Sequence, residues 1–379
     1  MKAGWEILPM GQLCTIQSGK SDTKDAVPDG LFAFFDRSKT IKRSNRYLRD
    51  CEALIIPGEG TEFLPRHFSG KFDLHQRAYA IFDFSPKLDA RFLFYYLHHV
   101  SDYFPRVAVG ATVKSLRLRH FEDLPVSVTA LVEQKRIVAR LDEAFAHIAT
   151  AKANAEQNLQ NARAVFDSHL QSVFAQREHG WVEKRFGDLA TFRNGVNFTK
   201  SSKGQSLEIV GVKDFQKHFW APTADLDVVT IEGELPDSDL LAENDILFVR
   251  SNGNPELIGR CLLIGAGSGA TSFSGFTIRA RLNDSSVKPI YLCHFLKSKR
   301  ARRTMIDGGN GVNIRSLNQG TLSNLVIPFP PITVQAKIVR KLEKLSTETQ
   351  RLESIYQQKL TALDALKKSL LHQAFSGQL

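Results

Sequence analysis

The sequence of 379 residues predicts an α+β protein: two mixed α/β domains separated by two long helices that pack as an antiparallel coiled coil, with the approximate two-fold symmetry of a tandem repeat. Three observations predict this fold. The phrase EQKRIVARLDEAF at 133–145 returns as VQAKIVRKLEKLS at 334–346. The phrase GWEILPMGQLCTIQSG at 4–19 matches GWVEKRFGDLATFRNG at 180–195. Residues 133–174 and 338–375 contain neither Gly nor Pro, although the chain holds 25 Gly and 14 Pro.

The two repeated phrases lie 201 and 176 residues apart, so the second copy carries 25 extra residues between its matching ends. A repeat of this length has the size of a domain and is too long for a solenoid unit. The sequence therefore predicts four segments. They are a front domain at 1–128, a long helix at 129–178, a second front domain at 179–327 and a second long helix at 328–379.

Each front domain shows short apolar runs bounded by turn residues, which indicates strands. We expect strands within 53–60, 77–84, 245–254, 259–267 and 276–282, and one apolar helix per domain, at 91–100 and 289–305. The stretch GAGSGA at 265–270 lacks the spacing and the Lys-Ser/Thr ending of a phosphate-binding loop, so we interpret it as a hairpin turn.

The long helices carry an apolar stripe with heptad spacing and one stutter, which is typical of coiled coils. The dipeptide Pro330-Pro331 marks where the second helix can begin. A helix of some 42 residues is roughly 60 Å long and needs a partner for so narrow a stripe. We expect the two helices to pack against each other, antiparallel, with the front domains at opposite ends. The residues expected in the seam are Ile137, Leu141, Ile148, Leu159, Ile338, Leu342, Leu352, Leu360 and Leu363.

The net charge is +10 and the pI about 9.4, which suits a polyanionic partner such as nucleic acid. Each front domain carries 18 basic and 15 acidic residues, so binding would come from folded surfaces rather than from a basic tail. The four cysteines form no C-x-x-C pair, which argues against a zinc site and a redox motif. Without a long apolar run, we expect a soluble protein of the reducing cytoplasm.

Several short motifs recur in the same order in both copies. They are the GW…G-x-L signature, the pattern G-x-x-x-x-S-L at 110–116 with a second version beginning at Gly309-Asn310, the run LVIPFPPITVQAKIV at 325–339 and the ending LLHQAFSGQL at 370–379. In these motifs the chain resembles the specificity (S) subunit of type I restriction-modification systems over essentially its whole length. The first copy departs from the pattern in one respect, since LPVSVTALVEQ at 124–134 replaces the proline-rich helix entry.

The resemblance implies a DNA-binding adaptor without catalytic residues or a metal site. Each front domain would be a target recognition domain that reads one half of a bipartite DNA sequence, and the helices would set the gap between the halves. The helices would also dock methyltransferase (M) subunits, two in number, which would recruit restriction (R) subunits. No cofactor is expected on this chain, since S-adenosylmethionine, ATP and Mg would bind the partner subunits. Isolated chains could pair through exposed helix faces.

Base reading needs Arg, Lys, Asn or Gln at groove edges, supported by phosphate contacts. In the first copy the densest candidate group is Lys39, Lys42, Arg43, Asn45, Arg46 and Arg49, and a second group is Arg66, His67, Lys71, His75 and Arg77. In the second copy the turn RSNGN offers Arg250, Ser251, Asn252 and Asn254, while Lys297, Arg300, Arg302 and Arg303 suit phosphate contacts. Lys114 and Arg315 occupy equivalent places, which favours a shared role in phosphate contact or packing. For the two groups of the first copy, a solvated basic loop is the competing interpretation.

Because the middles of the front domains do not align with each other, the two half-sites should differ. Two other function classes stay open. A self-contained DNA modification enzyme would need an amino-methyltransferase D/N-P-P-Y/F motif, and the nearest match is the unrelated NPEL at 254–257. A helical scaffold with protein-binding domains would show no salt-dependent DNA affinity.

Overall fold

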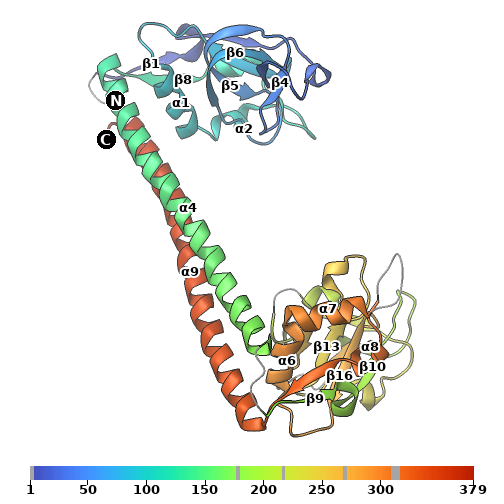
Figure 1. Ribbon diagram of the computed structural model, residues 1–379. Coiled ribbons are helices and arrows are strands. Elements are labelled where there is room, and N and C mark those ends of the chain that lie inside the picture. The colour runs from blue at the N-terminus through green and yellow to red at the C-terminus, as the bar shows by residue number, and fades with distance from the viewer. Residues whose placement is uncertain (1–3, 176–179, 216–217, 268–270, 309–315) are drawn as a thin grey trace. The chain divides into compact units, whose positions relative to one another are not determined.

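The computed structural model describes residues 4–175, 180–215, 218–267, 271–308 and 316–379 (Figure 1). The chain divides into two compact units. The first comprises Met1–Gln157 and Tyr356–Leu379, and the second Asn158–Ile355. Each unit therefore holds one front domain together with a part of each long helix.

The first unit is built on a six-stranded sheet of order β2-β7-β5-β6-β3-β4. Its strands are β2 (Thr15–Ser18), β3 (Phe32–Phe35), β4 (Lys42–Ser44), β5 (Arg49–Pro57), β6 (Arg66–Leu74) and β7 (Ala78–Phe82). A separate ladder pairs β1 (Glu6–Pro9) with β8 (Pro125–Val128). The helices are α1 (Ala90–His99), α2 (Tyr103–Val107) and α3 (Leu118–Glu122).

The glycine that ends each matching phrase, at 4–19 and at 180–195, permits a close backbone approach. A Cβ on Gly19 would lie 2.0 Å from the carbonyl oxygen of Leu74, and one on Gly195 would lie 2.2 Å from that of Ser274. Next to Gly19, Ser21 forms a parallel bridge with His75. The chain after β2 thus returns to the end of β6, and no residue with a side chain fits at that crossing.

Alternation along the strands gives the sheet of the first unit two apolar faces. Leu54, Ile56 and Ile81 pack with α1 in one core, and Ile55 and Phe72 belong to a second core on the other face. A strand buried on both faces reads as a continuous apolar run, which is why the sequence between 53 and 57 was recognisable.

The second unit repeats this architecture with two sheets, of order β10-β16-β13-β14 and β12-β11-β15. The strands are β10 (Ala190–Asn194), β11 (Ser206–Val210), β12 (Asp227–Thr230), β13 (Ile246–Val249), β14 (Cys261–Leu263), β15 (Thr271–Phe273) and β16 (Thr277–Leu282). A ladder pairs β9 (Val182–Arg185) with β17 (Val326–Phe329). The helices are α5 (Phe186–Leu189), α6 (Pro289–Lys297), α7 (Lys299–Asp307) and α8 (Gln319–Ser323).

The two copies differ because one strand is interrupted. The continuous nine-residue β6 of the first copy corresponds to two three-residue strands, β14 and β15, in the second, so that one sheet becomes two. Part of the extra length of the second copy lies between β11 and β12. Residues 211–226 separate these strands, where only 36–41 separate β3 from β4.

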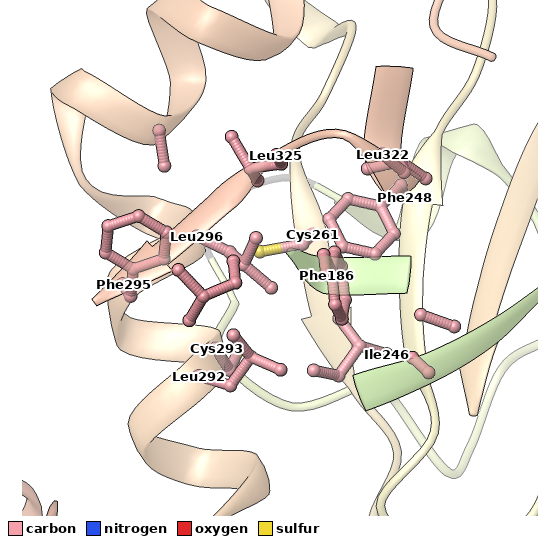
Figure 2. Packing of buried hydrophobic residues seen from close by; sticks show 14 of the residues in the cluster. Phe186, Ile246, Phe248, Cys261, Leu292, Cys293, Phe295, Leu296, Leu322 and Leu325 are labelled. Carbon is pink, nitrogen blue, oxygen red and sulfur yellow. The ribbon is translucent and has the colours of Figure 1, made fainter. Parts of the chain in front are cut away.

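The larger core of the second unit joins the four-stranded sheet to α6 and to the long helices. Figure 2 shows Phe186 and Phe248 packed beside Leu322 and Leu325, with Cys261 and Cys293 in the same cluster. Phe186 and Phe248 have no exposed surface. A second core, which includes Phe215, Leu247 and Phe273, lies on the other face of β13.

The long helices are α4 (Leu131–Ala175) and α9 (Ile332–Ser376), each of 45 residues. In the first unit the start of α4 shares a core with the end of α9, through Ile137 and Leu141 with Leu371 and Ala374. In the second unit the end of α4 shares a core with the start of α9, through Leu170 and Phe174 with Val339 and Leu342. The helices therefore run antiparallel in each unit.

Ion pairs cross between the helices as well. Lys152 pairs with Asp364 at 2.7 Å in the first unit, and Arg163 pairs with Glu353 at 2.9 Å in the second. Of the residues expected in the seam, Ile137, Leu141, Ile148, Leu159 and Leu342 are buried and Ile338, Leu360 and Leu363 are half-buried. Leu352 is 42% exposed, so its placement in the seam was wrong. From the buried Thr349 the seam steps by four residues to the half-buried Glu353, which turns Leu352 outward.

The other expected elements are present, with one correction. Each of the five predicted strand regions contains a strand, and the helix at 91–100 is α1. The single helix expected at 289–305 is instead two helices, because Ser298 has an extended backbone (ψ 150°) and caps α7 through its hydroxyl. A turn begins within the stretch 265–270, and residues 268–270 lie outside the described part.

Burial of His294 makes the second unit sensitive to acid. The side chain lies against Phe219 and Phe166, and burial, aided by Lys297, lowers the pKa of His294 from 6.5 to about 4. The unfolded chain takes up this proton near pH 6.5, whereas the folded chain resists it down to about pH 4. Above pH 6.5 the imidazole is neutral in both states, and the free energy of unfolding does not depend on it. As the pH falls from 6.5 toward 4, the unfolded chain alone gains the proton, so the free energy of unfolding falls by about 3 kcal/mol.

We expect His294→Leu to remove this part of the pH dependence. Urea unfolding of the wild type and the variant at pH 7 and pH 5 measures it, since the carboxylates titrate in both proteins and cancel in the comparison. Equal losses of unfolding free energy in the two proteins between these pH values would contradict the assignment.

Candidate nucleic-acid interface

The first unit carries a groove of about 730 Å³, here called groove 1, on its loops. It is formed by the loop after β3, the loop between β5 and β6, and the segment before α3. Its lining residues are Arg37, Ser38, Lys39, Pro57, Glu59, Gly60, Thr61, Glu62, Leu64, Pro65, Arg66, Thr112, Val113 and Lys114.

The second unit carries a smaller hollow of about 410 Å³, here called groove 2. The loop after β11, the loop after β13 and the turn before β16 contribute most of it. Its lining residues are Phe198, Ile209, Gly211, Val212, Lys213, Asp227, Ser251, Asn252, Gly253, Ser274 and Phe276.

Strand register shows that the two grooves occupy equivalent places. The last residue of β3 pairs with the last residue of β6, and the last residue of β11 pairs with the last residue of β15. Likewise β5 ends opposite Ala78 and β13 ends opposite Thr277. Residues 36–39 therefore correspond to 211–214, and the loop that begins at Gly58 corresponds to the one that begins at Arg250.

A shared backbone contact supports this equivalence. The amide of Leu116 donates to the carbonyl of Gly58, and the amide of Leu317 donates to the carbonyl of Arg250, both at 2.8 Å. Both leucines end the G-x-x-x-x-S-L pattern. The recurring motif thus fastens the same loop in each copy, and that loop borders the groove.

The charges of groove 1 are organised around two carboxylates. Glu59 accepts two hydrogen bonds of 3.0 Å from Arg77 and lies 3.9 Å from Arg37. Glu62 pairs with the exposed Lys39 at 2.9 Å. Arg37 and Lys39 hold their partners at the surface, where ion pairs are weak, so a phosphate can compete for both cations.

Arg66 holds the wall of groove 1. Its guanidinium donates to the carbonyls of Ser38 at 3.0 Å and Asp36 at 2.9 Å, and it stacks over the ring of Phe35. Burial lowers the pKa of Arg66. Burial alone would raise the pKa of Asp36, but hydrogen bonds from Lys42 and Ser38 outweigh it and lower the pKa.

Groove 2 has a different chemistry. Phe276 is 61% exposed and Phe198 38%, and both line the hollow beside the amide of Asn252. Asn252 accepts a hydrogen bond from the backbone of Asn254, and Asn254 accepts one from that of Glu256. These short-range bonds fix the loop conformation. Groove 2 thus offers two aromatic rings and an amide beside a single ion pair, Lys213 with Asp227. The lining of groove 1 has several cations and two carboxylates and no aromatic ring.

The structure brings only part of the predicted residues of the first copy into groove 1, namely Lys39, Arg66 and Lys114. Three others are held elsewhere. Arg43 donates to the carbonyls of Gly30 and Leu31, and Lys42 pairs with Asp36. Arg49 lies over the ring of Phe82.

Arg46 serves a buried carboxylate. It contacts Asp73, Asp25 and Ser21, and the carboxylate of Asp73 also accepts from the hydroxyls of Ser21 and Ser44. Such a network satisfies the charge of Asp73 inside the protein.

The rest of the second predicted group is dispersed. His67 contacts Glu52 at 2.7 Å, Lys71 lies over the ring of Tyr47, and Asn45 is exposed. Arg77 lies at the border of groove 1 through Glu59. His75 is corrected: it is buried, and its Nδ1 accepts from the backbone of Arg77, so it supports the turn and offers little surface to DNA.

In the second copy, Ser251 and Asn252 line groove 2. Asn254 lies next to it in the same loop and caps the turn at 255–257. The guanidinium of Arg250 donates to the carbonyl of Gly275 at 3.4 Å, and Gly275 directly precedes Phe276 in the sequence.

The basic stretch at 297–303 is only partly available. Lys297 is corrected, because its ammonium donates to the carbonyls of His218 and Cys261 and holds α6 to neighbouring segments. Arg302 is half-buried and donates to the carbonyl of Glu256, and burial lowers its pKa. Arg300 and Arg303 are exposed on α7. Arg315 lies outside the described residues.

Several groove residues escaped the sequence analysis: Arg37, Glu59 and Glu62 in groove 1, and Phe198, Lys213 and Phe276 in groove 2. Single basic, acidic or aromatic residues outside a dense group carry no binding signature in a sequence. The signal that finds them is the correspondence of loops, and this requires the strand register.

Comparison with known proteins places the chain in a family. The model of the type I restriction modification DNA specificity domain matches residues 2–161 and again 178–362. The chain belongs to this family. Its S-subunit resemblance is thereby confirmed, and the two matched stretches coincide with the two copies of the repeat.

Curated relatives agree. The chain is 24% identical to the type I restriction enzyme EcoDI specificity subunit of Escherichia coli, over 99% of this chain and 88% of that protein. It is 25% identical to the StySPI specificity subunit of Salmonella potsdam, over 99% of this chain and 83% of that protein. Neither the enzyme nor the scaffold alternative is favoured by these relatives.

Solved structures share the fold. A chain from a structural study of complex assembly and conformational transition of the type I R-M system matches with a TM-score of 0.76 at 16% identity, covering 100% of this chain and 99% of that one. The HsdS subunit from Thermoanaerobacter tengcongensis matches with a TM-score of 0.60 at 16% identity, covering 100% and 98%. The predicted fold class of two mixed α/β domains with two long helices is confirmed.

Two further observations concern the part of the chain that the structure describes. Within it, no three His, Cys, Asp or Glu side chains are grouped so as to hold a metal ion. No helix of the described segments is both long and apolar enough to cross a membrane.

We expect Arg66→Met to release the loop at 36–39. Loss of two charged hydrogen bonds should lower the free energy of local opening by about 2 kcal/mol. Amide hydrogen exchange at residues 36–39 would then quicken by about 30-fold. Arg43→Met is the matched control, since Arg43 also donates to two carbonyls but at Gly30 and Leu31. Unchanged exchange at 36–39 in Arg66→Met would show that the arginine does not hold the wall.

Proposed function

We propose that this chain is the DNA-reading subunit of a type I restriction-modification complex. Residues 1–128 and 179–327 act as target recognition domains, and each reads one half of a bipartite, asymmetric DNA target. Residues 129–178 and 328–379 act as spacer helices that set the distance between the halves. The observation that carries this proposal is the pair of equivalent grooves with different linings.

The equivalent positions of the two grooves and the difference between their linings have separate consequences. Two readers built on the same frame can approach DNA in the same manner, because the same loops border the groove in each. Identical linings would read identical half-sites and give a palindromic target. Groove 1 has cations and carboxylates without an aromatic ring, whereas groove 2 adds two aromatic rings and an amide to its one ion pair, and this difference favours two unlike half-sites.

Each groove suggests roles for its residues. In groove 1, Lys39 and Lys114 contact phosphates, and Arg37 is available for a base edge. In groove 2, Asn252 is suited to adenine, whose exposed edge offers one acceptor and one donor to an amide, and Phe276 is suited to the methyl group of thymine. Arg300 and Arg303, exposed on α7, contribute further phosphate contacts.

The long helices dock two methyltransferase subunits, and restriction subunits join through these. S-adenosylmethionine, ATP and Mg belong to those partners, so the chain itself contributes recognition and no catalytic residue. In the absence of partners, exposed apolar residues on the helices, such as Val165 and Ile355, can pair two chains. A cytoplasmic location follows from the DNA target.

Methylation sequencing tests the proposal. The chain is co-expressed with its candidate methyltransferase subunit, and methylated adenines in the host DNA are mapped. We expect methylation confined to one bipartite motif with unlike halves, lost when this chain is omitted. Random or absent methylation from an intact complex would sink the proposal.

Groove variants assign the halves. Asn252→Ala should relax one half of the motif only, by about 1–3 kcal/mol of discrimination at the affected base pair. Lys114→Ala should weaken DNA binding for all sequences alike and lower the slope of affinity against salt by about one. Binding of the purified complex to matched and mismatched duplexes at several salt concentrations separates the two effects. A motif unchanged by Asn252→Ala would remove groove 2 from the reading surface.

A further inference from the structure

A glutamine is buried at the same place near the start of each long helix. Gln134 and Gln335 both have no exposed surface, although glutamine is mostly a surface residue. The two are equivalent in the repeat, since the matching phrases begin at 133 and 334. A polar side chain buried completely, and twice, requires partners that explain it.

The partners are also equivalent. The amide nitrogen of Gln134 donates to the carbonyls of Lys87 and Thr129, both at 2.7 Å, and its oxygen accepts from the amide of Asp89 at 2.9 Å. In this way one side chain ties α4 to two segments of the front domain, namely the loop before α1 and the strand end before α4.

The second copy shows the same pattern. The nitrogen of Gln335 donates to the carbonyls of Ser286 at 3.0 Å and Pro330 at 2.9 Å, and its oxygen accepts from the amide of Lys288 at 2.8 Å. All three contacts go to backbone groups. The same pattern can therefore form in both copies although the side chains around it differ.

The chemistry requires an amide. Two donors and one acceptor meet two carbonyls and one N–H, so every group is satisfied. A glutamate would bring its carboxylate against two carbonyl oxygens, and an apolar side chain would leave three backbone groups without partners. No other side chain of this length supplies the set.

The junction between each front domain and the long helices is here called the joint. A second set of contacts at the joint comes from the other long helix. Phe375, near the end of α9, contacts Phe92 and Tyr96 of α1, with ring centroids 5.2 Å apart in both cases. Phe174, near the end of α4, contacts Tyr291 and Phe295 of α6, at 5.6 and 5.3 Å. Each domain is thus held by the start of one helix and the end of the other.

We infer that Gln134 and Gln335 are positioning residues that fix the angle between each reading domain and the spacer helices, and thereby set the gap between half-sites that the protein accepts. This inference rests on the proposed function. Each glutamine lies at the joint, apart from both grooves, so it influences spacing without touching DNA.

The geometry makes the gap sensitive to this joint. A rigid helix of 45 residues is about 67 Å long, so a tilt of about 3° at one end moves the other by about 3.5 Å. Successive base pairs are separated by about 3.4 Å along the duplex. A small loosening at the joint therefore corresponds to one base pair of spacing.

The test uses Gln134→Met and Gln335→Met, since methionine matches glutamine in length and flexibility but makes none of the three bonds. Gln160→Met and Gln358→Met, at exposed positions of the same two helices, are matched controls. Each variant is co-expressed with the methyltransferase subunit. Methylation is then measured on plasmids that carry the motif with the natural gap and with one base pair more or less.

We expect the ratio of methylation at altered gaps to methylation at the natural gap to rise at least tenfold in both joint variants. It should stay unchanged in the controls, and the bases read in each half-site should stay the same in all four. A ratio within twofold of the wild type in the joint variants would overturn the inference.

Folding is monitored by circular dichroism and by assembly with the methyltransferase subunit. Failure of both joint variants to fold or assemble would also overturn the inference, since the glutamines would then serve folding itself. Failure of the proposed function is distinguishable, because the wild-type complex would then show no bipartite motif.

Discussion

The attachment of each reading domain to both long helices is the constraint on which the rest of the structure depends. A 45-residue helix with a narrow apolar stripe cannot bury that stripe alone, and in each front domain a short helix, α1 or α6, packs against the long helices. The two needs are met together, because the cores of the units include the domain, the start of one long helix and the end of the other. The chain is therefore duplicated in sequence and interleaved in structure.

The features that the two copies share lie in the common frame and at the joint, and the features that differ between the copies lie on the loops. The signature glycines, the G-x-x-x-x-S-L motif, the buried glutamines and the helix-end phenylalanines all act through backbone contacts or packing at the frame. The grooves lie on loops that this frame positions but does not specify. A fold of this kind can change its loops without disturbing the joint, which is the property that an exchangeable DNA reader needs.

The excess of positive charge is less available than the composition suggests. Arg46 serves the buried Asp73, and Arg281 serves the buried Asp245 with two hydrogen bonds of 2.8 and 2.7 Å. Lys297 and Arg66 donate to backbone carbonyls. These cations stabilise loops and strand ends, so the surface that remains for DNA is narrower and more specific than a count of Lys and Arg indicates.

The sequence by itself determined the architecture. Repetition revealed the two copies, the absence of Gly and Pro revealed the long helices, and uniform apolar runs revealed the central strands, because each of these is a local pattern with a fixed period. Tertiary structure alone decided the site. Arg46 contacts Asp73, which lies 27 residues later in the chain, so its role depends on how the strands pair. Phe276 lines groove 2 because the pairing of β13 with β16 places it beside the loop after β13. The broken strand of the second copy and the outward turn of Leu352 were likewise hidden, since both arise from long-range packing that no short segment encodes.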